Sequence, residues 1–278
     1  MFFHEKESIA LYLDNLVRLE SMVTLKQKIE IYRHDTLGLV LMINDEIQHI
    51  ENYQCMYHEQ LVHLPMSFCE RPQTALVLGG GSLFAAYELL KYPSIQSITL
   101  CDHDYTVLKL MEKYYDHAKM VLTNKRFHFI ENDGVEFLDR NKIHYDIIVN
   151  DCFNLLKESN TYGCSFFKKM HDMLTDKGVC SDIIYRHIFD GAITHDSIQE
   201  IKKCSNIALS LVTVPEYPGI LHIQTIWGKN KNIAQTCKST YNSFQQKCLK
   251  TNSFPFEFYS PQNLPYYLYL PSYIKDKL

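Results

Sequence analysis

Residues 74–92 read TALVLGGGSLFAAYELLKY, a short apolar strand pattern, a glycine triplet and a helical pattern in succession. The apolar run is typical of a buried strand, and the apolar spacing after the glycines predicts a helix. Gly79, Gly80 and Gly81 allow the backbone to approach a ligand where side chains would clash. A glycine triplet alone is as often a plain turn, so its meaning depends on the residues around it.

Strand and helix patterns continue to alternate after this stretch. Apolar, β-branched runs predict strands at 97–102, 126–133, 145–151 and 179–184. Helical spacing predicts helices at 106–115, 135–140 and 165–174. Such alternation implies a parallel sheet covered by helices on both faces. The predicted fold class is α/β, with a doubly wound, mostly parallel, Rossmann-like (class I methyltransferase-like) sheet.

The preceding residues have a different pattern. Residues 27–49 alternate between apolar and polar side chains around a turn at 35–38, which predicts β-hairpins. Apolar residues within 1–20 predict a short amphipathic helix, and residues 54–66 predict a second helix that ends at Pro65. We therefore expect a small β-rich N-terminal subdomain of helix and hairpins at 1–66, followed by the Rossmann-like domain at 67–278.

The composition is that of an ordinary globular protein, with 46% hydrophobic and 22% charged residues. A net charge of −4 gives no electrostatic case for nucleic acid or anionic membranes as partners. Nine cysteines without a CxxC pair fit reduced thiols in the cytosol. The sequence shows no signal-peptide pattern and no apolar run long enough to span a bilayer. We expect a cytoplasmic protein.

Carboxylates stand at the ends of successive predicted strands. Asp102 ends the second strand, Asp133 follows the third, and Asp151 ends the fourth. The carboxyl ends of parallel strands form one edge, where ligands bind in such sheets. A carboxylate after the second strand suits hydrogen bonding to ribose hydroxyls, so the pattern favours a nucleoside site. The alternatives are a helix N-cap for Asp102 or Asp133 and a solvated turn for Asp151.

Several segments together resemble one family. TALVLGGG, ITLCDHD, IENDGVEFL and YDIIVND resemble, in order and spacing, the adenosyl-binding core of spermidine synthases. INDEIQHIENYQCMYHE is similar to the family's L-D-G-x-x-Q…D-E-x-x-Y-H-E segment, and TVPEYPG is similar to its V-P-T-Y-P-S-G loop. FEFYSPQNLPYYLYLP is similar to its C-terminal K-Y-Y-N…F-x-L-P segment. The resemblance covers residues 27–275.

The resemblance implies a polyamine aminopropyltransferase. Such an enzyme moves the aminopropyl group of its co-substrate, decarboxylated S-adenosylmethionine, to putrescine, without a prosthetic group or a metal. The resemblance also implies a homodimer or homotetramer, and an adenosyl-binding, catalytic role for residues 67–278. Asp151 matches the general base, and Tyr57 matches the tyrosine that positions the amine. A carboxylate can accept the proton that the amine loses, and acidic surroundings orient cationic substrates.

The remaining site residues fall into two groups. Those expected to bind the adenosyl co-substrate are Gln48, His58, Gly79, Gly80, Gly81, Ser82, Asp102, Asp133 and Gly134. Those expected to bind the amine are Asn154, Tyr217 and Tyr259.

The sequence departs from the family pattern on the side of the amines. The family's G-G-G-D-G-G becomes GGGSLF, so Ser82 stands where an acid binds the aminopropyl ammonium. In the D-S-S-D-P loop the second acid becomes Asn154, and the Q-x-E after the fifth strand is replaced at 183–185. A hydroxyl or an amide cannot neutralise an ammonium, and an unpaired buried charge is costly. The candidate replacements are Glu59, Asp182 and Glu216.

Other interpretations stay open. A sulfonium-dependent methyltransferase of a small amine would tolerate Ser82, and a non-catalytic homologue would keep only the fold. His58 and His63 beside Glu59 have HExxxH spacing, which places the two rings on different sides of a helix and does not suit zinc. Cys152 is interpreted as a packed thiol. Residues 265–270 predict a strand or a subunit contact.

Overall fold

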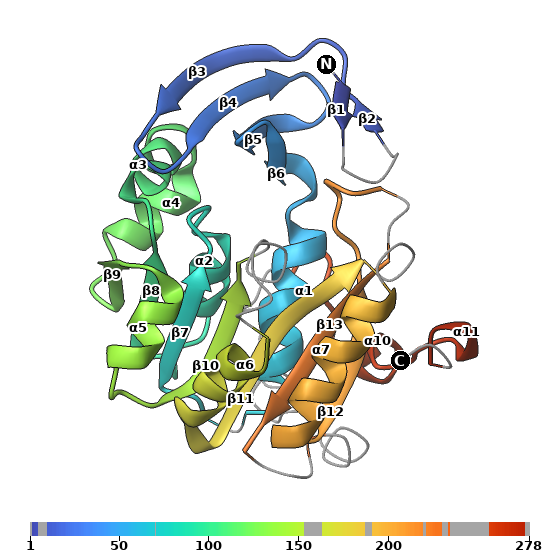
Figure 1. The fold of residues 1–278 in the computed structure, drawn as a ribbon. Coiled ribbons are helices and arrows are strands. Elements are labelled where there is room, and N and C mark those ends of the chain that lie inside the picture. The colour runs from blue at the N-terminus through green and yellow to red at the C-terminus, as the bar shows by residue number, and fades with distance from the viewer. Residues whose placement is uncertain are drawn as a thin grey trace.

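The computed structural model describes most of the chain. The described residues are 2–4, 10–69, 71–152, 163–186, 191–218, 221–229, 233 and 256–275. They form a small antiparallel sheet at the N-terminal end and a larger, mostly parallel sheet with helices on both faces (Figure 1).

The small sheet has four strands in the order β3-β4-β5-β6, each antiparallel to its neighbour. Their bounds are β3 Val17–Val23, β4 Lys28–His34, β5 Gly38–Ile43 and β6 Glu46–Ile50. Asn44 and Asp45, between β5 and β6, have positive φ angles of 51° and 64°, as a type I′ hairpin turn requires. The predicted hairpins are confirmed.

The predicted helix within residues 1–20 is wrong. Two short strands, β1 (Phe2–His4) and β2 (Ala10–Tyr12), pair antiparallel in this region, and β3 begins at Val17. Three of the apolar residues in this region, Ile9, Leu11 and Leu13, lie two positions apart, a spacing that is typical of strands. The backbone groups that a helix would have paired internally are paired across the strands instead.

The large sheet has the strand order β12-β13-β11-β10-β7-β8-β9. The bounds are β7 Thr74–Gly79, β8 Ser97–Asp102, β9 Phe127–Glu131, β10 Tyr145–Asp151, β11 Leu174–Arg186, β12 Ile207–Val212 and β13 His222–Gly228. Strands β7 to β11 are parallel, and β13 is antiparallel to β11 and β12. The methyltransferase-like α/β prediction is confirmed, and β12 and β13 extend the five predicted strands. The strand order reverses between β7 and β10, the topological switch point.

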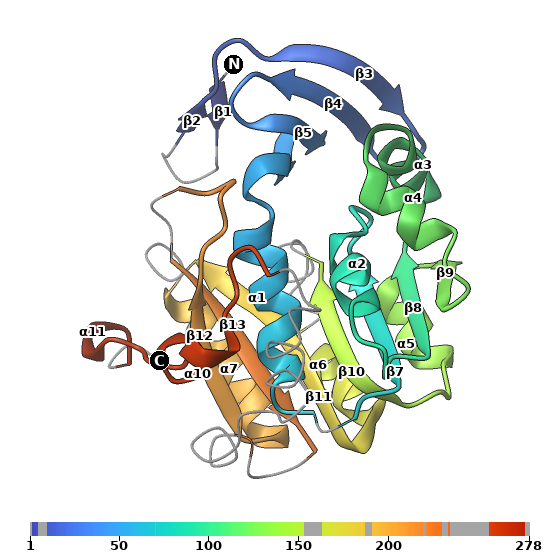
Figure 2. The ribbon, with the colours of Figure 1, turned by 180° about the vertical axis from the view of Figure 1, so that it is seen from behind.

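Helices cover both faces of the large sheet. The bounds are α1 Cys55–Met66, α2 Phe84–Leu90, α3 Tyr105–Tyr114, α4 Asp116–Leu122, α5 Gly134–Arg140, α6 Gly163–Asp172, α7 Gly191–Cys204, α10 Leu264–Tyr267 and α11 Ser272–Lys275, with 3-10 turns η1 Glu51–Tyr53 and η2 Pro261–Asn263. Figures 1 and 2 show α5, α6 and α7 on one face and α1 and α2 on the other. Within the described ranges, no helix is long and apolar enough to cross a bilayer.

The predicted strand at residues 265–270 is wrong. Leu264–Tyr267 is the short helix α10, with Pro265 in its first turn. Proline suits that position because its missing N–H would have no partner inside the helix. Tyr266 and Tyr269 are largely exposed, and the subunit contact stays a prediction.

One hydrophobic core joins the two parts. Ile31 of β4, Leu61 of α1 and Val77 of β7 belong to the same buried cluster. Figure 1 shows β7 and β10 pointing toward the small sheet, and Figure 2 shows α1 running from that sheet along the large one. The N-terminal end of α1 therefore lies over the carboxyl edge of the large sheet, while the predicted boundary at residue 66 stays a prediction.

Candidate active site

Asp151 lies at the carboxyl end of β10, next to the switch point. The hydroxyl of Tyr57 donates a hydrogen bond to Asp151 Oδ1 over 2.8 Å, and Nε2 of His58 lies 4.0 Å from Oδ2. The Asp151 side chain is only 9% exposed. Burial raises its pKa to about 7, opposed by the Tyr57 hydrogen bond and reinforced by the charge of Asp102. A carboxylate with such a pKa can take or release a proton near neutral pH.

Tyr57 and His58 come from the first turns of α1, which the small sheet directs toward this edge. Burial and the negative charge of Asp151 raise the pKa of Tyr57 well above its ordinary value, so the phenol stays a donor. Burial lowers the pKa of His58 to about 4, so the ring is uncharged at neutral pH. Two predicted site residues, one assigned to the amine and one to the adenosyl co-substrate, therefore lie beside Asp151, Tyr57 as a hydrogen-bond donor and His58 as a neutral neighbour.

The glycine turn brings backbone against both carboxylates of the edge. Gly80 has a positive φ of 73°, and a Cβ on it would lie 3.0 Å from Asp151 Oδ2. A Cβ on Gly81 would lie 3.1 Å from Asp102 Oδ2. A side chain at either position would crowd these oxygens, so the glycines meet a need for close approach.

Asp102 ends β8 with its side chain mostly buried. It accepts hydrogen bonds from the backbone N–H groups of Gly81 and of Asp104, the latter over 3.0 Å. Burial raises its pKa, and these hydrogen bonds oppose the rise. Asp104 rather than Asp102 is the N-cap of α3, because its side chain accepts from Thr106 N–H. The N-cap interpretation is therefore wrong for Asp102, and its proposed ribose role stays a prediction.

Asp133 is the N-cap of α5, as the alternative interpretation predicted. Its exposed side chain accepts hydrogen bonds from the N–H groups of Val135 and Glu136 at the start of the helix. Gly134 is the first residue of that helix. The cap uses one carboxylate oxygen, so an adenine contact through the other stays a prediction.

Three predicted residues lie around the loop and strand ends. Gln48 is half-buried on β6, above the sheet edge. Ser82 is half-buried after the glycines, and its carbonyl accepts a hydrogen bond of 2.9 Å from Nε2 of His117. Asn154 lies outside the described residues.

The two predicted tyrosines are placed differently from each other. Tyr217 is half-buried in the turn before β13, with its ring 5.7 Å from that of His222. Tyr259 is 2% exposed in a separate hydrophobic cluster, and its hydroxyl is 2.7 Å from Ser67 Oγ. Its ring also stacks on Tyr267 at 5.2 Å. These contacts place Tyr259 in the packing of this cluster, and its role in binding the amine stays a prediction.

A cluster of rings that the sequence did not predict lies beside the glycine turn. The Phe84 ring stacks on His117 at 3.6 Å and lies 4.3 Å from His49 and 5.1 Å from His58. Burial lowers the pKa of His117 to about 4, and that of His49 lies well below its ordinary value for the same reason. The histidines are therefore uncharged at neutral pH. They come from three different elements, so no sequence spacing could have signalled them.

The histidines of the HExxxH segment and Cys152 have separate surroundings. His63 pairs with Glu88 at 2.8 Å, whereas His58 faces Asp151. Within the part of the chain that the structure describes, no group of His, Cys, Asp and Glu is placed to hold a metal ion. Burial raises the pKa of Cys152 well above its ordinary value, which keeps the thiol protonated and unreactive.

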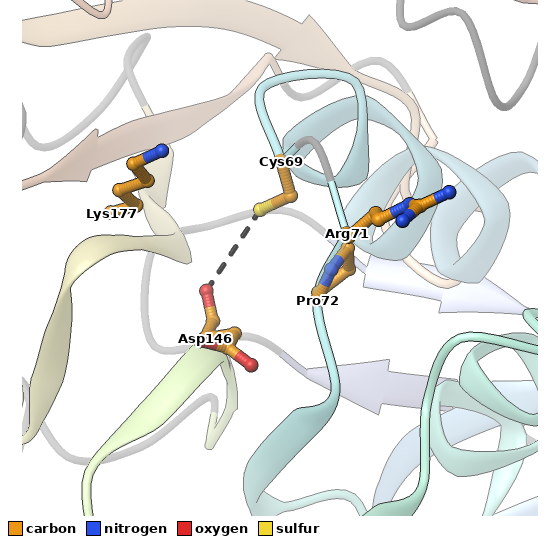
Figure 3. A pocket seen from close by; sticks show the side chains of 5 residues that line it. All are labelled: Cys69, Arg71, Pro72, Asp146 and Lys177. Atoms are coloured by element: carbon orange, nitrogen blue, oxygen red, sulfur yellow. Dashed lines mark hydrogen bonds between the residues drawn. The ribbon is translucent and has the colours of Figure 1, made fainter.

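A cavity of about 240 Å³ lies at the opposite end of the large sheet (Figure 3). It is lined by Cys69, Arg71, Pro72, Asp146 and Lys177. Asp146, at the start of β10, already accepts hydrogen bonds from the backbone N–H groups of Gln73 and Thr74. Burial raises the pKa of Cys69 to about 12, so it offers no nucleophile. The cavity is therefore remote from the carboxyl ends of the strands, where Asp102 and Asp151 lie.

The small antiparallel sheet and the methyltransferase-like sheet together define the structural class, and solved structures agree. The crystal structure of a spermidine synthase in complex with the transition-state analogue AdoDATO is 22% identical, covers 100% of this chain and 94% of that chain, and has a TM-score of 0.86. At this identity the likeness establishes the fold.

Sequence comparisons define the family. The family model described as "Spermine/spermidine synthase domain" matches residues 54–237, more than half of the chain. A polyamine aminopropyltransferase of Thermoanaerobacter sp. strain X514 is 23% identical over 244 residues, which are 86% of this chain and 83% of that protein. One from Buchnera aphidicola subsp. Acyrthosiphon pisum strain Tuc7 is 24% identical over 285 residues, 99% of this chain and 97% of its own. The chain belongs to the spermine/spermidine synthase family and is an enzyme of the transferase class.

Proposed function

We propose that the chain transfers the aminopropyl group of decarboxylated S-adenosylmethionine to putrescine, with Asp151 as the general base. The observation that carries this proposal is the hydrogen bond of 2.8 Å from Tyr57 to Asp151 Oδ1 at the switch point of the sheet. It orients the carboxylate and leaves Oδ2 to accept a proton. The glycine at position 80 keeps the approach to Oδ2 free of a side chain.

The proposed step balances as a displacement at carbon. The uncharged amine nitrogen of putrescine forms a bond to the aminopropyl carbon beside the sulfonium, and the carbon–sulfur bond breaks. Its electron pair returns to sulfur, which leaves as the neutral thioether of methylthioadenosine. The nitrogen's proton passes to Asp151. Holding the two substrates together supplies a large share of the rate in such a displacement.

The adenosyl part of the co-substrate is assigned to the edge beside the glycine turn. Asp102 would accept from the ribose hydroxyls and Asp133 from the adenine amine, with Gln48 and His58 on the sulfonium side. Support comes from the close approach of Gly81 to Asp102 and from the family match.

The test is to identify the product by mass. We expect spermidine from putrescine and decarboxylated S-adenosylmethionine, and no product from intact S-adenosylmethionine. A methylated amine from the intact cofactor would overturn the proposal in favour of a methyltransferase. Methylthioadenosine binding without turnover of either cofactor would favour a non-catalytic homologue.

A further inference from the structure

Three buried carboxylates are available to replace the acids missing from the amine side of the site, namely Glu59, Asp182 and Glu216. A substrate ammonium needs a carboxylate that is not already neutralised, since a buried charge must be paired. The contacts of these three side chains distinguish them.

Glu59 is already used to hold the chain together. Its Oε1 accepts from Glu257 N–H over 2.8 Å, and its Oε2 accepts from the N–H groups of Phe258 and Tyr259 over 2.8 and 2.7 Å. The residue is 1% exposed. Both oxygens are saturated by backbone donors, so Glu59 fastens the segment at 257–259 to α1 and is not free to bind an amine.

Asp182 lies within the sheet, paired in register with Asn150 of β10. Its Oδ1 accepts a hydrogen bond of 3.0 Å from Asn150 Nδ2, and the residue is 3% exposed. Burial raises its pKa to about 7. Asp182 is therefore level with Asn150, one residue before Asp151 at the carboxyl end of β10.

Glu216 lies in the turn between β12 and β13 and is 8% exposed. Its Oε1 accepts a hydrogen bond of 2.9 Å from Ile50 N–H, which ties the turn to the end of β6. The donors to this carboxylate among the described residues are backbone N–H groups, those of Ile50 and of Glu216 itself, and no Lys or Arg pairs with it there. Among the described residues, this buried acid therefore has no cationic partner.

Glu216 also shares its surroundings with the proposed base. The charge of Asp151 acts on Glu216, and the hydroxyl of Tyr57 experiences the charges of Asp151, Glu216 and the more deeply buried Asp182. Asp151 lies at the end of β10 and hydrogen-bonds to Tyr57, whereas Glu216 lies in the turn that follows β12 and acts on Tyr57 through its charge. A cation placed beside Tyr57 would be attracted by both.

We propose that Glu216 binds the second, non-reacting ammonium of a primary diamine, while Asp151 takes the proton from the reacting nitrogen. This rests on the proposed function and adds the residue that makes the acceptor a diamine rather than a monoamine. Residue 216 would then supply a negative charge for the diamine, whereas Asn154 stands where the family pattern has an acid.

The experiment compares putrescine with 1-aminobutane, which lacks the second ammonium, in the full-length enzyme and in Glu216→Gln. A charge-assisted hydrogen bond contributes ~1.5–3 kcal/mol, so we expect kcat/KM for putrescine to fall about 10- to 100-fold in the variant. The value for 1-aminobutane should change less than about twofold, because that substrate makes no such bond. The ratio of kcat/KM for putrescine to that for 1-aminobutane would then fall by about the same factor as the value for putrescine.

An equal fall for both amines would overturn the proposal, since it would mean that Glu216 only holds Ile50 and the turn in place. Asp182→Asn is the matched control, because it neutralises a carboxylate of similar burial that should affect both amines alike. If the unmodified enzyme forms no aminopropyl product, the proposed function fails. Glu216 is then tested by calorimetric binding of the two amines to the protein saturated with methylthioadenosine. Weaker putrescine binding in Glu216→Gln supports the assignment, and unchanged binding overturns it.

Discussion

The edge beside the glycine turn and the region around Tyr57 are both acidic but are built differently. At the glycine turn, Asp102 and Asp133 accept hydrogen bonds from backbone N–H groups, which neutralise part of their charge within the fold. Around Tyr57, burial raises the pKa values of Asp151, Asp182 and Glu216 to about 7. In the described part of the chain no Lys or Arg pairs with these three. In the first region backbone donors therefore offset part of the negative charge, whereas in the second the described residues supply no Lys or Arg to offset it.

Asp151 is the residue at which we expect the largest difference between an effect on turnover and an effect on nucleoside binding. Asp151→Asn keeps the shape of the side chain but removes the proton acceptor, and general base catalysis contributes ~10²–10⁴-fold. We expect kcat to fall about 1,000-fold while the affinity for methylthioadenosine, measured by calorimetry, changes less than about threefold. A large loss of nucleoside affinity would show that the two regions are not separable. Turnover close to that of the unmodified enzyme would remove Asp151 from its assigned role.

The opposite pattern is expected at the glycine edge. Asp102→Asn replaces a charged acceptor of ribose hydroxyls, a change that costs ~1.5–3 kcal/mol, or about 10- to 100-fold in affinity for methylthioadenosine. Asp133→Asn is the matched control, because asparagine is also a good N-cap and the residue is exposed. It should weaken binding by less than about fivefold. Equal effects of the two variants would contradict the ribose role of Asp102.

The sequence predicted the glycine edge better than the region around Tyr57 for a physical reason. Gly80, Asp102 and Asp151 follow parallel strands, and parallel strands bring their carboxyl ends together whatever the rest of the chain does. The ring cluster around Phe84 depends on how β6, α1, α2 and α4 pack, which local patterns do not encode. The sequence alone could not choose among Glu59, Asp182 and Glu216 as the acid that binds the amine. Glu59 is excluded only by its hydrogen bonds to backbone N–H groups of residues 257–259.

The one large error in the fold has a similar origin. Residues 17–23 form an outer strand of the small sheet, with Val17 and Val23 exposed by 61% and 79%. An outer strand of this kind lacks the buried, alternating face that makes strands recognisable, so the apolar residues Ile9, Leu11, Leu13, Leu16 and Val17 favour a helix instead. Antiparallel pairing with the next strand, β4, determined the outcome.

The pH dependence should also separate the two regions. Asp151 must be ionised to accept a proton, so kcat/KM should fall more steeply with decreasing pH below its pKa of about 7 than above it, in addition to the effect of amine ionisation. The groups that face it are Tyr57, His58, Asp102 and Glu216.

The hydrogen bond from Tyr57 lowers the pKa of Asp151, so Tyr57→Phe should move the acidic limb to higher pH. Dividing the pH profile of kcat/KM of the variant by that of the unmodified enzyme cancels the ionisation of the amine substrate, which is the same in both. Asp102→Asn removes a charge that raises this pKa and should move the limb to lower pH. Shifts in the same direction for both variants would contradict the assignment of the limb to Asp151.

The smallest effect concerns Ser82, where the family pattern has an acid. Ser82→Asp restores a half-exposed carboxylate next to the glycine turn, and an ion pair of that exposure contributes ~0–1 kcal/mol. We expect decarboxylated S-adenosylmethionine to bind about two- to fivefold more tightly, with no change for methylthioadenosine, which carries no ammonium. The two ligands, titrated into the same variant, provide the control.

An unchanged affinity for both ligands in Ser82→Asp would mean that the aminopropyl ammonium does not bind next to residue 82. Leu83, which follows Ser82, is fully buried with a positive φ of 66°, and Phe84 is stacked on His117. A non-glycine residue in this conformation is strained and persists only where packing holds it. If the restored acid has no effect, these two side chains have taken the space in which it would meet the ammonium. The aminopropyl group must then be held from the side of Tyr57, by carboxylates with which no described Lys or Arg pairs.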